Sequence, residues 1–306
     1  MKVLICDPIA DDGINMLKEN GFEVEIKTGM DKEELKNVIK DYDAIVVRSA
    51  TKVTADVIES AANLKLIVRG GVGIDNIDVE AAKSKGITVQ NTPTASTVSV
   101  AEHTFALLLA LARNVSLADR SMKEGRWEKK KFKGTELYNK TLGLIGVGRI
   151  GLAVAKRAIG FEMKVIGYDP YLDPNIMRDN GVEPVTDIDR LVQEADIISL
   201  HIPLTNETKH IINSERIQKM KDGAILINCA RGGVVDEDAL YQALKSGKLA
   251  GAALDVFEQE PPENSPLLGL DNIILTPHIG ASTKEAQKRV GIESAKTIIK
   301  FFENNK

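Results

Sequence analysis

The sequence predicts an α/β protein of two domains, each built on a parallel sheet whose two faces are covered by helices. Two observations predict this class. Short apolar runs of strand length alternate with stretches of helical period along almost the whole chain. The chain has 306 residues, which is enough for two domains of ordinary size. Such alternation is typical of parallel sheets that are buried on both faces.

The composition is that of an ordinary globular protein and argues against several functional classes. Hydrophobic residues make up 43% and charged residues 27% of the chain. A net charge of -4 argues against general nucleic-acid binding, which needs many phosphate contacts. Cys6 and Cys229 lie far apart without C-x-x-C spacing, so we expect a reducing, cytoplasmic setting. The histidines are scattered, which predicts no metal site, and no apolar run reaches membrane-spanning length.

The first part of the chain contains five apolar runs of strand length, at residues 3–6, 22–26, 44–47, 66–68 and 87–89. Helical patterns between them begin at capping residues such as Asp31 and Thr54. Arg48 and Ser49 follow the third run, and a glycine-rich segment at 70–73 follows the fourth. Ligands of open α/β sheets bind outside the carboxyl ends of the strands, so this edge is a candidate anion site. A structural ion pair explains Arg48 equally well from these residues alone.

Residues 98–114 form a helical pattern that is apolar on almost every side. Such a helix cannot face water, so we expect it to be buried between domains and against a second copy of the chain, as a homodimer. We expect Glu102 and His103 within it to be satisfied interface residues rather than catalytic ones. The basic and aromatic segment at 126–132 is either a solvated surface loop or a source of positive charge for a partner's active site.

The most informative stretch is residues 141–151, TLGLIGVGRIG. An apolar strand runs into a G-x-G-x-x-G turn, and a helical pattern continues from it. Gly146 permits a tight turn, Gly148 lets a pyrophosphate approach the backbone, and Gly151 lets helix and strand pack closely. Asp169 ends the next strand, where a carboxylate binds ribose hydroxyls and repels a 2′-phosphate. These features predict a Rossmann-type domain that binds NAD rather than NADP.

A second alternating series completes this cofactor domain. Its strands are predicted at residues 164–168, 182–185, 196–200, 224–228, 251–254 and 273–275. Helices between them begin at Asp187, Asn213 and Asp236, and Gly247 ends one of them. A final amphipathic helix at about residues 283–302 is long enough to pack back on the first domain. We therefore expect a Rossmann NAD-binding domain at residues 95–282, inserted into a flavodoxin-like substrate domain formed by residues 1–94 and 283–306.

Three strand ends in this second series carry side chains that suit hydride transfer. Arg231, Glu260 and His278 each follow a predicted strand, so they share a sheet edge with the glycine turn. Oxidising a 2-hydroxy acid requires a base for the hydroxyl proton, a cation for the carboxylate and a cofactor for the hydride. His278 suits the first task and Arg231 the second, while Glu260 would orient His278 and favour its protonated form.

These residues also carry a resemblance to a known family. Six segments resemble the D-isomer-specific 2-hydroxyacid dehydrogenases along essentially the whole chain: VRSATKVTADVI (47–58), GVGIDNID (71–78), GLIGVGRIG (143–151), NCARGGVVDEDAL (228–240), GAALDVFEQEPP (251–262) and HIGASTKEAQ (278–287). The resemblance implies that Arg231, Glu260 and His278 are catalytic, with His278 as the acid/base. It also implies an NAD site lined by Gly146, Gly148, Arg149, Ile150, Gly151, Asp169, His201, Pro203, Thr208, Cys229, Ala230, Asp255 and Gly280. The residues that match the substrate site are Arg48, Ser49, Val72, Gly73 and Asn76.

On this resemblance we expect NAD-dependent oxidation of a phosphorylated 2-hydroxy acid, 3-phosphoglycerate, to 3-phosphohydroxypyruvate, the first step of serine biosynthesis. Arg48 and the basic loop at 126–132, which would reach the partner's active site, favour this doubly anionic substrate. A reductase of glyoxylate, hydroxypyruvate or another 2-keto acid is the alternative, and an NAD-sensing corepressor is a third possibility. The chain ends soon after the last predicted helix, so we expect no C-terminal regulatory domain.

Overall fold

The computed structural model describes residues 1–305 and divides into two compact units, each built on one parallel sheet. The first unit contains residues 1–97 and 281–305, and the second contains residues 98–280. The predicted α/β class with two parallel sheets is confirmed, and each predicted strand is present with its ends within two residues of the predicted ones.

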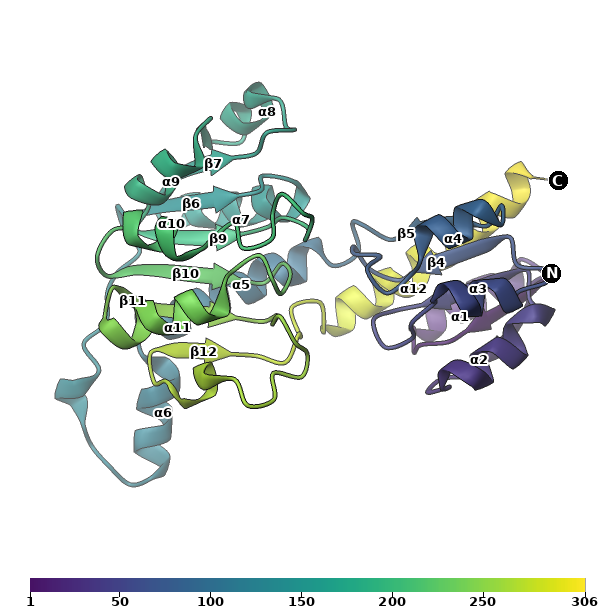
Figure 1. Cartoon of the computed structure of the whole chain (residues 1–306), viewed down its shortest axis with the longest axis horizontal. Coiled ribbons are helices and arrows are strands. Elements are labelled where there is room, and N and C mark those ends of the chain that lie inside the picture. Colours follow the sequence, from purple (N-terminus) through teal and green to yellow (C-terminus); the bar gives the residue numbers. More distant parts are fainter. Residues whose placement is uncertain (306) are drawn as a thin grey trace. The chain divides into compact units, whose positions relative to one another are not determined.

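The first unit has a sheet of five parallel strands in the order β2-β1-β3-β4-β5 (Figure 1). The strands are β1 (Lys2–Ile5), β2 (Glu23–Ile26), β3 (Ala44–Val47), β4 (Leu66–Arg69) and β5 (Thr88–Asn91). The helices are α1 (Asp11–Glu19), α2 (Lys32–Val38), the short 3-10 helix η1 (Ile39–Asp41), α3 (Ala55–Ser60), α4 (Val79–Ser84) and α12 (Lys284–Asn304). Strand order reverses between β1 and β3, so the loops after these two strands meet at the carboxyl edge.

Both faces of this sheet are covered, which is why its three central strands, β1, β3 and β4, are mainly apolar and buried. Leu35 of α2 and Val57 of α3 pack on one face, and Ile298 and Phe302 of α12 pack on the other. Thr283 caps the N-terminus of helix α12, and its hydroxyl accepts a hydrogen bond of 3.0 Å from the amide of Ala286 in the first turn. The last helix of the chain therefore completes the core of the first unit.

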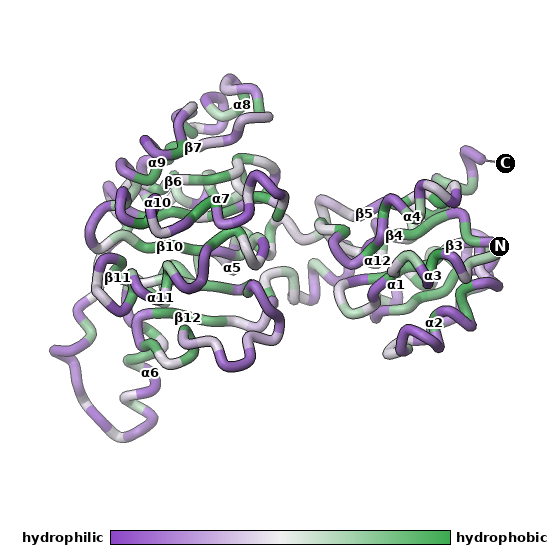
Figure 2. Tube along the Cα trace, in the orientation of Figure 1, coloured by the Kyte–Doolittle hydropathy of each residue, from purple (hydrophilic) through white to green (hydrophobic). Residues whose placement is uncertain are grey.

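The second unit has seven parallel strands in the order β12-β11-β10-β9-β6-β7-β8. The strands are β6 (Thr141–Ile145), β7 (Lys164–Tyr168), β8 (Glu183–Pro184), β9 (Ile197–Leu200), β10 (Ala224–Asn228), β11 (Leu249–Leu254) and β12 (Ile273–Leu275). The helices are α5 (Thr97–Ala112), α6 (Val115–Lys123), η2 (Lys129–Lys131), α7 (Arg149–Gly160), α8 (Pro174–Asp179), α9 (Ile188–Glu194), α10 (Ser214–Lys219), α11 (Glu237–Ser246) and η3 (Pro266–Gly269). Strand order reverses between β6 and β9, where doubly wound sheets bind their ligands. Figure 2 shows the strands of this sheet as mainly hydrophobic and the loops around them as mainly hydrophilic.

The long apolar helix expected at residues 98–114 is α5, and it ends earlier than predicted. Asn114 takes a left-handed conformation with φ 52°, and a separate helix that the sequence analysis did not predict, α6, follows it. Phe105 and Leu108 of α5 are buried against β6 and β10, whereas Ala106 on the other side of the helix is exposed. No single helix in residues 1–305 is long and apolar enough to cross a membrane. Helices α5 and α6, bent by 64°, reach that length and composition only as a pair.

Candidate active site

The carboxyl edge of the second sheet carries the residues that the sequence analysis assigned to catalysis. Arg231 follows β10, Glu260 follows β11 and His278 follows β12, and these three strands are neighbours in the sheet. The loop that begins at His201 follows β9, and the glycine turn follows β6. A cation, a carboxylate, an imidazole and a turn of the phosphate-binding type therefore lie along one edge.

The glycine turn fits a dinucleotide because close contacts surround it on one side and open space lies on the other. Gly146 has φ 88°, and a Cβ there would lie 2.5 Å from the carbonyl oxygen of His201. A Cβ on Gly151 would lie 2.3 Å from the carbonyl oxygen of Gly146. A Cβ on Gly148, by contrast, would meet no described atom within 4 Å. That space lies at the N-terminus of α7, whose free amides suit a pyrophosphate.

Asp169 lies at the end of β7, and two backbone amides hold its carboxylate beside the glycine turn. Val147 N donates to Oδ2 at 2.9 Å, and Tyr171 N donates to Oδ1 at 3.0 Å. These two hydrogen bonds fix the orientation of the Asp169 carboxylate at the end of β7.

Among the other predicted cofactor residues, His201, Thr208 and Cys229 carry uncharged side chains. Burial lowers the pKa of His201 to about 4, so its imidazole is uncharged near neutral pH. The hydroxyl of Thr208 donates to the carbonyl oxygen of Pro203 at 2.6 Å and closes the loop after β9. Burial, with a smaller contribution from the charge of Asp255, raises the pKa of the Cys229 thiol to about 12. In the described part of the chain, no group of three His, Cys, Asp or Glu side chains is arranged to hold a metal ion.

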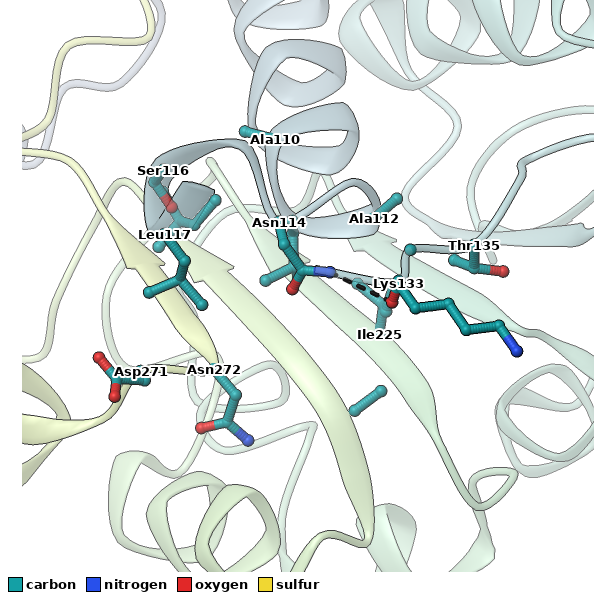
Figure 3. A pocket seen from close by; sticks show the side chains of 14 residues that line it. Ala110, Ala112, Asn114, Ser116, Leu117, Lys133, Thr135, Ile225, Asp271 and Asn272 are labelled. Atoms are coloured by element: carbon teal, nitrogen blue, oxygen red, sulfur yellow. Dashed lines mark hydrogen bonds between the residues drawn. The ribbon is translucent and has the colours of Figure 1, made fainter. Parts of the chain in front are cut away.

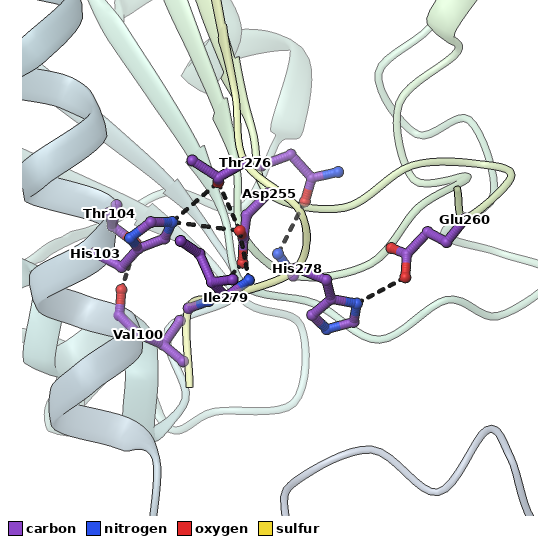
Figure 4. A network of polar contacts seen from close by, with 11 residues as sticks. Val100, His103, Thr104, Asp255, Glu260, Thr276, His278 and Ile279 are labelled. Atoms are coloured by element: carbon purple, nitrogen blue, oxygen red, sulfur yellow. Dashed lines mark hydrogen bonds and ion pairs between the residues drawn. The ribbon is translucent and has the colours of Figure 1, made fainter. Parts of the chain in front are cut away.

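His278 and Glu260 form the pair expected of an oriented general base. Nδ1 of His278 lies 2.8 Å from Oε2 of Glu260, and Figure 4 shows the two side chains facing each other. A carboxylate only accepts hydrogen bonds, so Nδ1 carries the proton and Nε2 of the neutral imidazole keeps its lone pair. Phe257 N donates to the other oxygen of Glu260 at 3.2 Å. The side chains of His278 and Glu260 are 44% and 39% exposed, so the pair is open to solvent.

A buried carboxylate holds the backbone that follows His278. Asp255 is 1% exposed and accepts hydrogen bonds from the Thr276 hydroxyl at 2.6 Å and from the amides of Ile279 and Gly280 at 2.8 Å each. Burial alone would raise the pKa of Asp255, but these hydrogen bonds, together with one from His103, outweigh it and hold the pKa below its usual value. The ionised carboxylate therefore ties down the turn that carries His278, which has φ 54°.

Arg231 lies on a loop that is fixed by the last residue of β10. Asn228 is buried, its Oδ1 accepts a hydrogen bond from Ala230 N at 3.0 Å, and its Nδ2 donates to the carbonyl oxygen of Arg231 at 2.8 Å. Nη1 of Arg231 donates to the carbonyl oxygen of Ala230 at 2.6 Å. The loop conformation therefore depends on an amide side chain at the end of an otherwise apolar strand.

The predicted substrate residues lie in the first unit, around the carboxyl ends of its central strands. They are Arg48, Ser49, Val72, Gly73 and Asn76. The buried carboxylate of Asp7, after β1, accepts hydrogen bonds from Arg48 N at 2.5 Å and from the Thr51 hydroxyl at 2.8 Å. Asn76 Nδ2 donates to the carbonyl oxygen of Arg48 at 2.7 Å. Nε of Arg48 is buried and has no hydrogen-bond partner among the described residues, which suits an anionic ligand.

Four residues that hold these sites together had no predicted role in them: Asp7, Asn228, Thr276 and His103, the last of which was expected to be an interface residue. Asp7 and Asn228 carried a usable signal, because each is a polar residue at the carboxyl end of an apolar run. Thr276 carried the same signal, two residues before His278. His103 carried none, because only folding brings helix α5 next to the loop after β12.

Comparison with known proteins places the chain in one family. The model of the D-isomer specific 2-hydroxyacid dehydrogenase, NAD binding domain, matches residues 105–280. A D-3-phosphoglycerate dehydrogenase of Methanocaldococcus jannaschii is 59% identical over 99% of this chain and 57% of its own length. A hydroxypyruvate reductase of Thermotoga maritima is 55% identical over 98% of this chain and 97% of its own length. The chain spans about half the length of the D-3-phosphoglycerate dehydrogenases that it matches.

A solved structure of the same family is also similar to this chain. The D-lactate dehydrogenase of Aquifex aeolicus, in complex with NAD and lactic acid, has a TM-score of 0.86 and 36% identity, over 99% of this chain and 96% of that one. The match covers both units, and the family model covers the unit with the glycine turn. The chain therefore belongs to the D-isomer-specific 2-hydroxyacid dehydrogenases, and its second unit is the NAD-binding domain of that family.

Proposed function

We propose that the protein is an NAD-dependent dehydrogenase that oxidises D-3-phosphoglycerate to 3-phosphohydroxypyruvate, as in the first step of serine synthesis. The observation that carries the proposal is the His278–Glu260 pair, 2.8 Å apart, on the same sheet edge as Arg231 and the glycine turn. The relatives named D-3-phosphoglycerate dehydrogenase support this substrate.

In this proposal each of the three side chains has one task. The guanidinium of Arg231 grips the substrate carboxylate through two hydrogen bonds. Nε2 of His278 accepts the proton of the C2 hydroxyl, while Nδ1 keeps donating to Glu260. NAD, when bound, supplies the acceptor for the hydride that leaves C2. The carboxylate of Glu260 then stabilises the imidazolium, which returns the proton to C2 oxygen when the reaction runs backward.

The phosphorylated substrate carries a second anionic group, and Arg48 is proposed to bind it. Asp7 and Asn76 hold the backbone of Arg48 on both sides, so its side chain leaves a fixed loop. We propose that Ser49, Val72, Gly73 and Asn76 complete this substrate site, and that Gly146–Gly151, Asp169, His201 and Asp255 belong to the NAD site.

Arg48→Gln should raise the KM for 3-phosphoglycerate by about 10- to 100-fold, the cost of a charge-assisted hydrogen bond of about 1.5–3 kcal/mol. Steady-state kinetics with D-glycerate, which lacks the phosphate, should show a KM change below about threefold. Lys65→Gln is the matched control, because it removes one cation from the amino edge of the same sheet, where Lys65 pairs with Asp43 at 3.1 Å. Equal increases of KM for both substrates in Arg48→Gln would contradict phosphate binding by Arg48.

A reductase of hydroxypyruvate or glyoxylate is the second candidate, because the Thermotoga maritima relative of matching length has the former name. The deciding experiment compares NADH formation from 3-phosphoglycerate with NADH consumption by phosphohydroxypyruvate, hydroxypyruvate and glyoxylate. A higher kcat/KM for the phosphorylated pair supports the main proposal. A higher value for unphosphorylated keto acids supports the reductase, and turnover of none of them supports an NAD-sensing protein without catalysis.

We also propose that the protein is a cytoplasmic homodimer that uses helix α5 and the segments after it. A cavity of about 390 Å³ lies beside the end of α5, and Ala110, Leu117 and Ile225 are among the residues that line it (Figure 3). Trp127 is 79% exposed in the basic loop, which we propose reaches the partner's active site. A second copy of the chain would cover these apolar groups. Sedimentation equilibrium tests this assembly, and the mass of a single chain at micromolar concentration would refute it.

A further inference from the structure

His103 extends from helix α5 to the two side chains that hold the loop of His278. Its Nε2 lies 3.1 Å from the Thr276 hydroxyl and 3.3 Å from Oδ1 of Asp255. The side chain is 16% exposed. Figure 4 shows the ring directed from α5 into this polar cluster, on the side of the loop away from Glu260.

The number of protons on these three side chains determines which group donates and which accepts in each hydrogen bond. Asp255 is an ionised carboxylate and only accepts, so the single proton of the Thr276 hydroxyl is donated to Oδ1 at 2.6 Å. The same hydroxyl can then only accept from His103. Nε2 of His103 therefore carries a proton and shares it between Thr276 and Asp255. His103 is a donor in this arrangement whether its ring is neutral or charged.

This donor connects a rigid helix to the catalytic turn. Helix α5 is anchored by buried residues such as Phe105 and Leu108. From Asp255, hydrogen bonds continue to the amides of Ile279 and Gly280, and the carbonyl oxygen of Thr276 accepts from His278 N at 3.0 Å. The turn is also tightly enclosed, because a Cβ on Gly280 would lie 3.0 Å from Oδ2 of Asp255 and 3.7 Å from the ring of His103.

His278 needs such support because of its backbone. A non-glycine residue at φ 54° persists only where the surrounding structure holds it. Glu260 orients the ring of His278 from one side, but it makes no described contact with the backbone of the turn. The backbone is held from the other side, through Asp255 and Thr276.

We propose that His103 is a positioning residue for the reaction, which places His278 by donating from Nε2 to Thr276 and Asp255. The inference rests on the proposed function, in which Nε2 of His278 moves the proton. It replaces the expectation that His103 is only a satisfied interface residue.

His103→Leu removes the donor at similar volume, and we expect kcat to fall about 10- to 100-fold, as for small misplacements of a reacting group. KM for the hydroxy acid should change by less than about threefold, because Arg231 and Arg48 still bind it. His103→Gln should restore kcat to within about threefold of wild type. The amide Nε2 of glutamine is as many bonds from Cα as Nε2 of histidine and also donates.

Glu102→Gln on the same helix is the matched control. It weakens the ion pair of Glu102 with Arg157, at 3.0 Å, without reaching the cluster, and should leave kcat unchanged. A comparable loss of kcat in Glu102→Gln would show that any damage to α5 impairs the enzyme and would overturn the specific role of His103. Equal kcat values for wild type and His103→Leu would overturn it as well.

Amide hydrogen exchange tests the inference without relying on activity. In His103→Leu, peptides that contain Ile279 and Gly280 should exchange about tenfold faster than in wild type, whereas core peptides from β6 and β10 stay protected. His103→Gln should exchange like wild type. Unchanged exchange in His103→Leu would refute the inference even if the wild-type protein proved inactive with every hydroxy acid, a result that would separately refute the proposed function.

Discussion

His278→Ala should lower kcat by about 1,000-fold, because it removes the group that exchanges a proton with the C2 oxygen of the substrate. The Kd of NADH, measured by fluorescence titration, should stay within about threefold of the wild-type value. The two effects separate because Nε2 of His278 is assigned to the reacting oxygen, whereas the glycine turn and Asp169 hold the cofactor. The His278–Glu260 pair, at 2.8 Å, is the structural basis of this expectation.

His210→Ala is a close control for this variant. His210 also has a left-handed backbone, with φ 49°, and its Nε2 lies 3.0 Å from the carboxylate of Glu258. It thus reproduces the geometry of a loop histidine paired with a glutamate, and its kcat should match that of wild type. If His278→Ala turned over at a near-normal rate, another residue would be the acid/base and the proposed mechanism would be wrong.

Arg231→Gln should lower kcat/KM by about 100- to 1,000-fold. The variant loses two charge-assisted hydrogen bonds to the substrate carboxylate, each of about 1.5–3 kcal/mol, and water that hydrogen-bonds to the carboxylate offsets part of this loss. Arg231→Lys should recover only part of this loss, because an ammonium keeps the charge but lacks the planar fork. Steady-state kinetics at saturating NAD measures both variants.

The control for Arg231 is Arg216→Gln, in the same unit. Arg216 pairs with Asp189 at 3.0 Å, away from the carboxyl edge of the sheet, and its loss should leave kcat/KM within about twofold of wild type. Full activity of Arg231→Lys would mean that charge alone suffices and would remove the two-point grip from the mechanism. Full activity of Arg231→Gln would exclude the substrate carboxylate as its partner.

The central strands of both sheets could be predicted from the sequence because they are buried on both faces. Ala44–Val47 and Ile197–Leu200 are buried at every position, so their apolar runs have no other stable environment. The helix boundary near residue 113 could not be predicted in the same way. Helix α5 ends because Asn114 takes a left-handed backbone conformation. An asparagine within an otherwise helical pattern does not by itself predict that conformation.

Only part of the candidate site could be predicted from the sequence. The carboxyl ends of parallel strands share one edge, so the positions of Arg231, Glu260 and His278 in the sequence already placed them together in a doubly wound sheet. Which atoms meet depends on loops, and the pairing of Nδ1 of His278 with Glu260 needs the conformation of residues 255–260.

By itself, the sequence determined the parallel strands, the glycine turn and the sheet edge on which the reactive side chains lie, because burial and glycine geometry act on residues close together in the chain. Only the tertiary structure decided that His103 lies beside Asp255 and Thr276, more than 150 residues away. That contact depends on how α5 packs against the sheet. No local sequence pattern predicts it, because the packing energy arises only when both segments are assembled in the core.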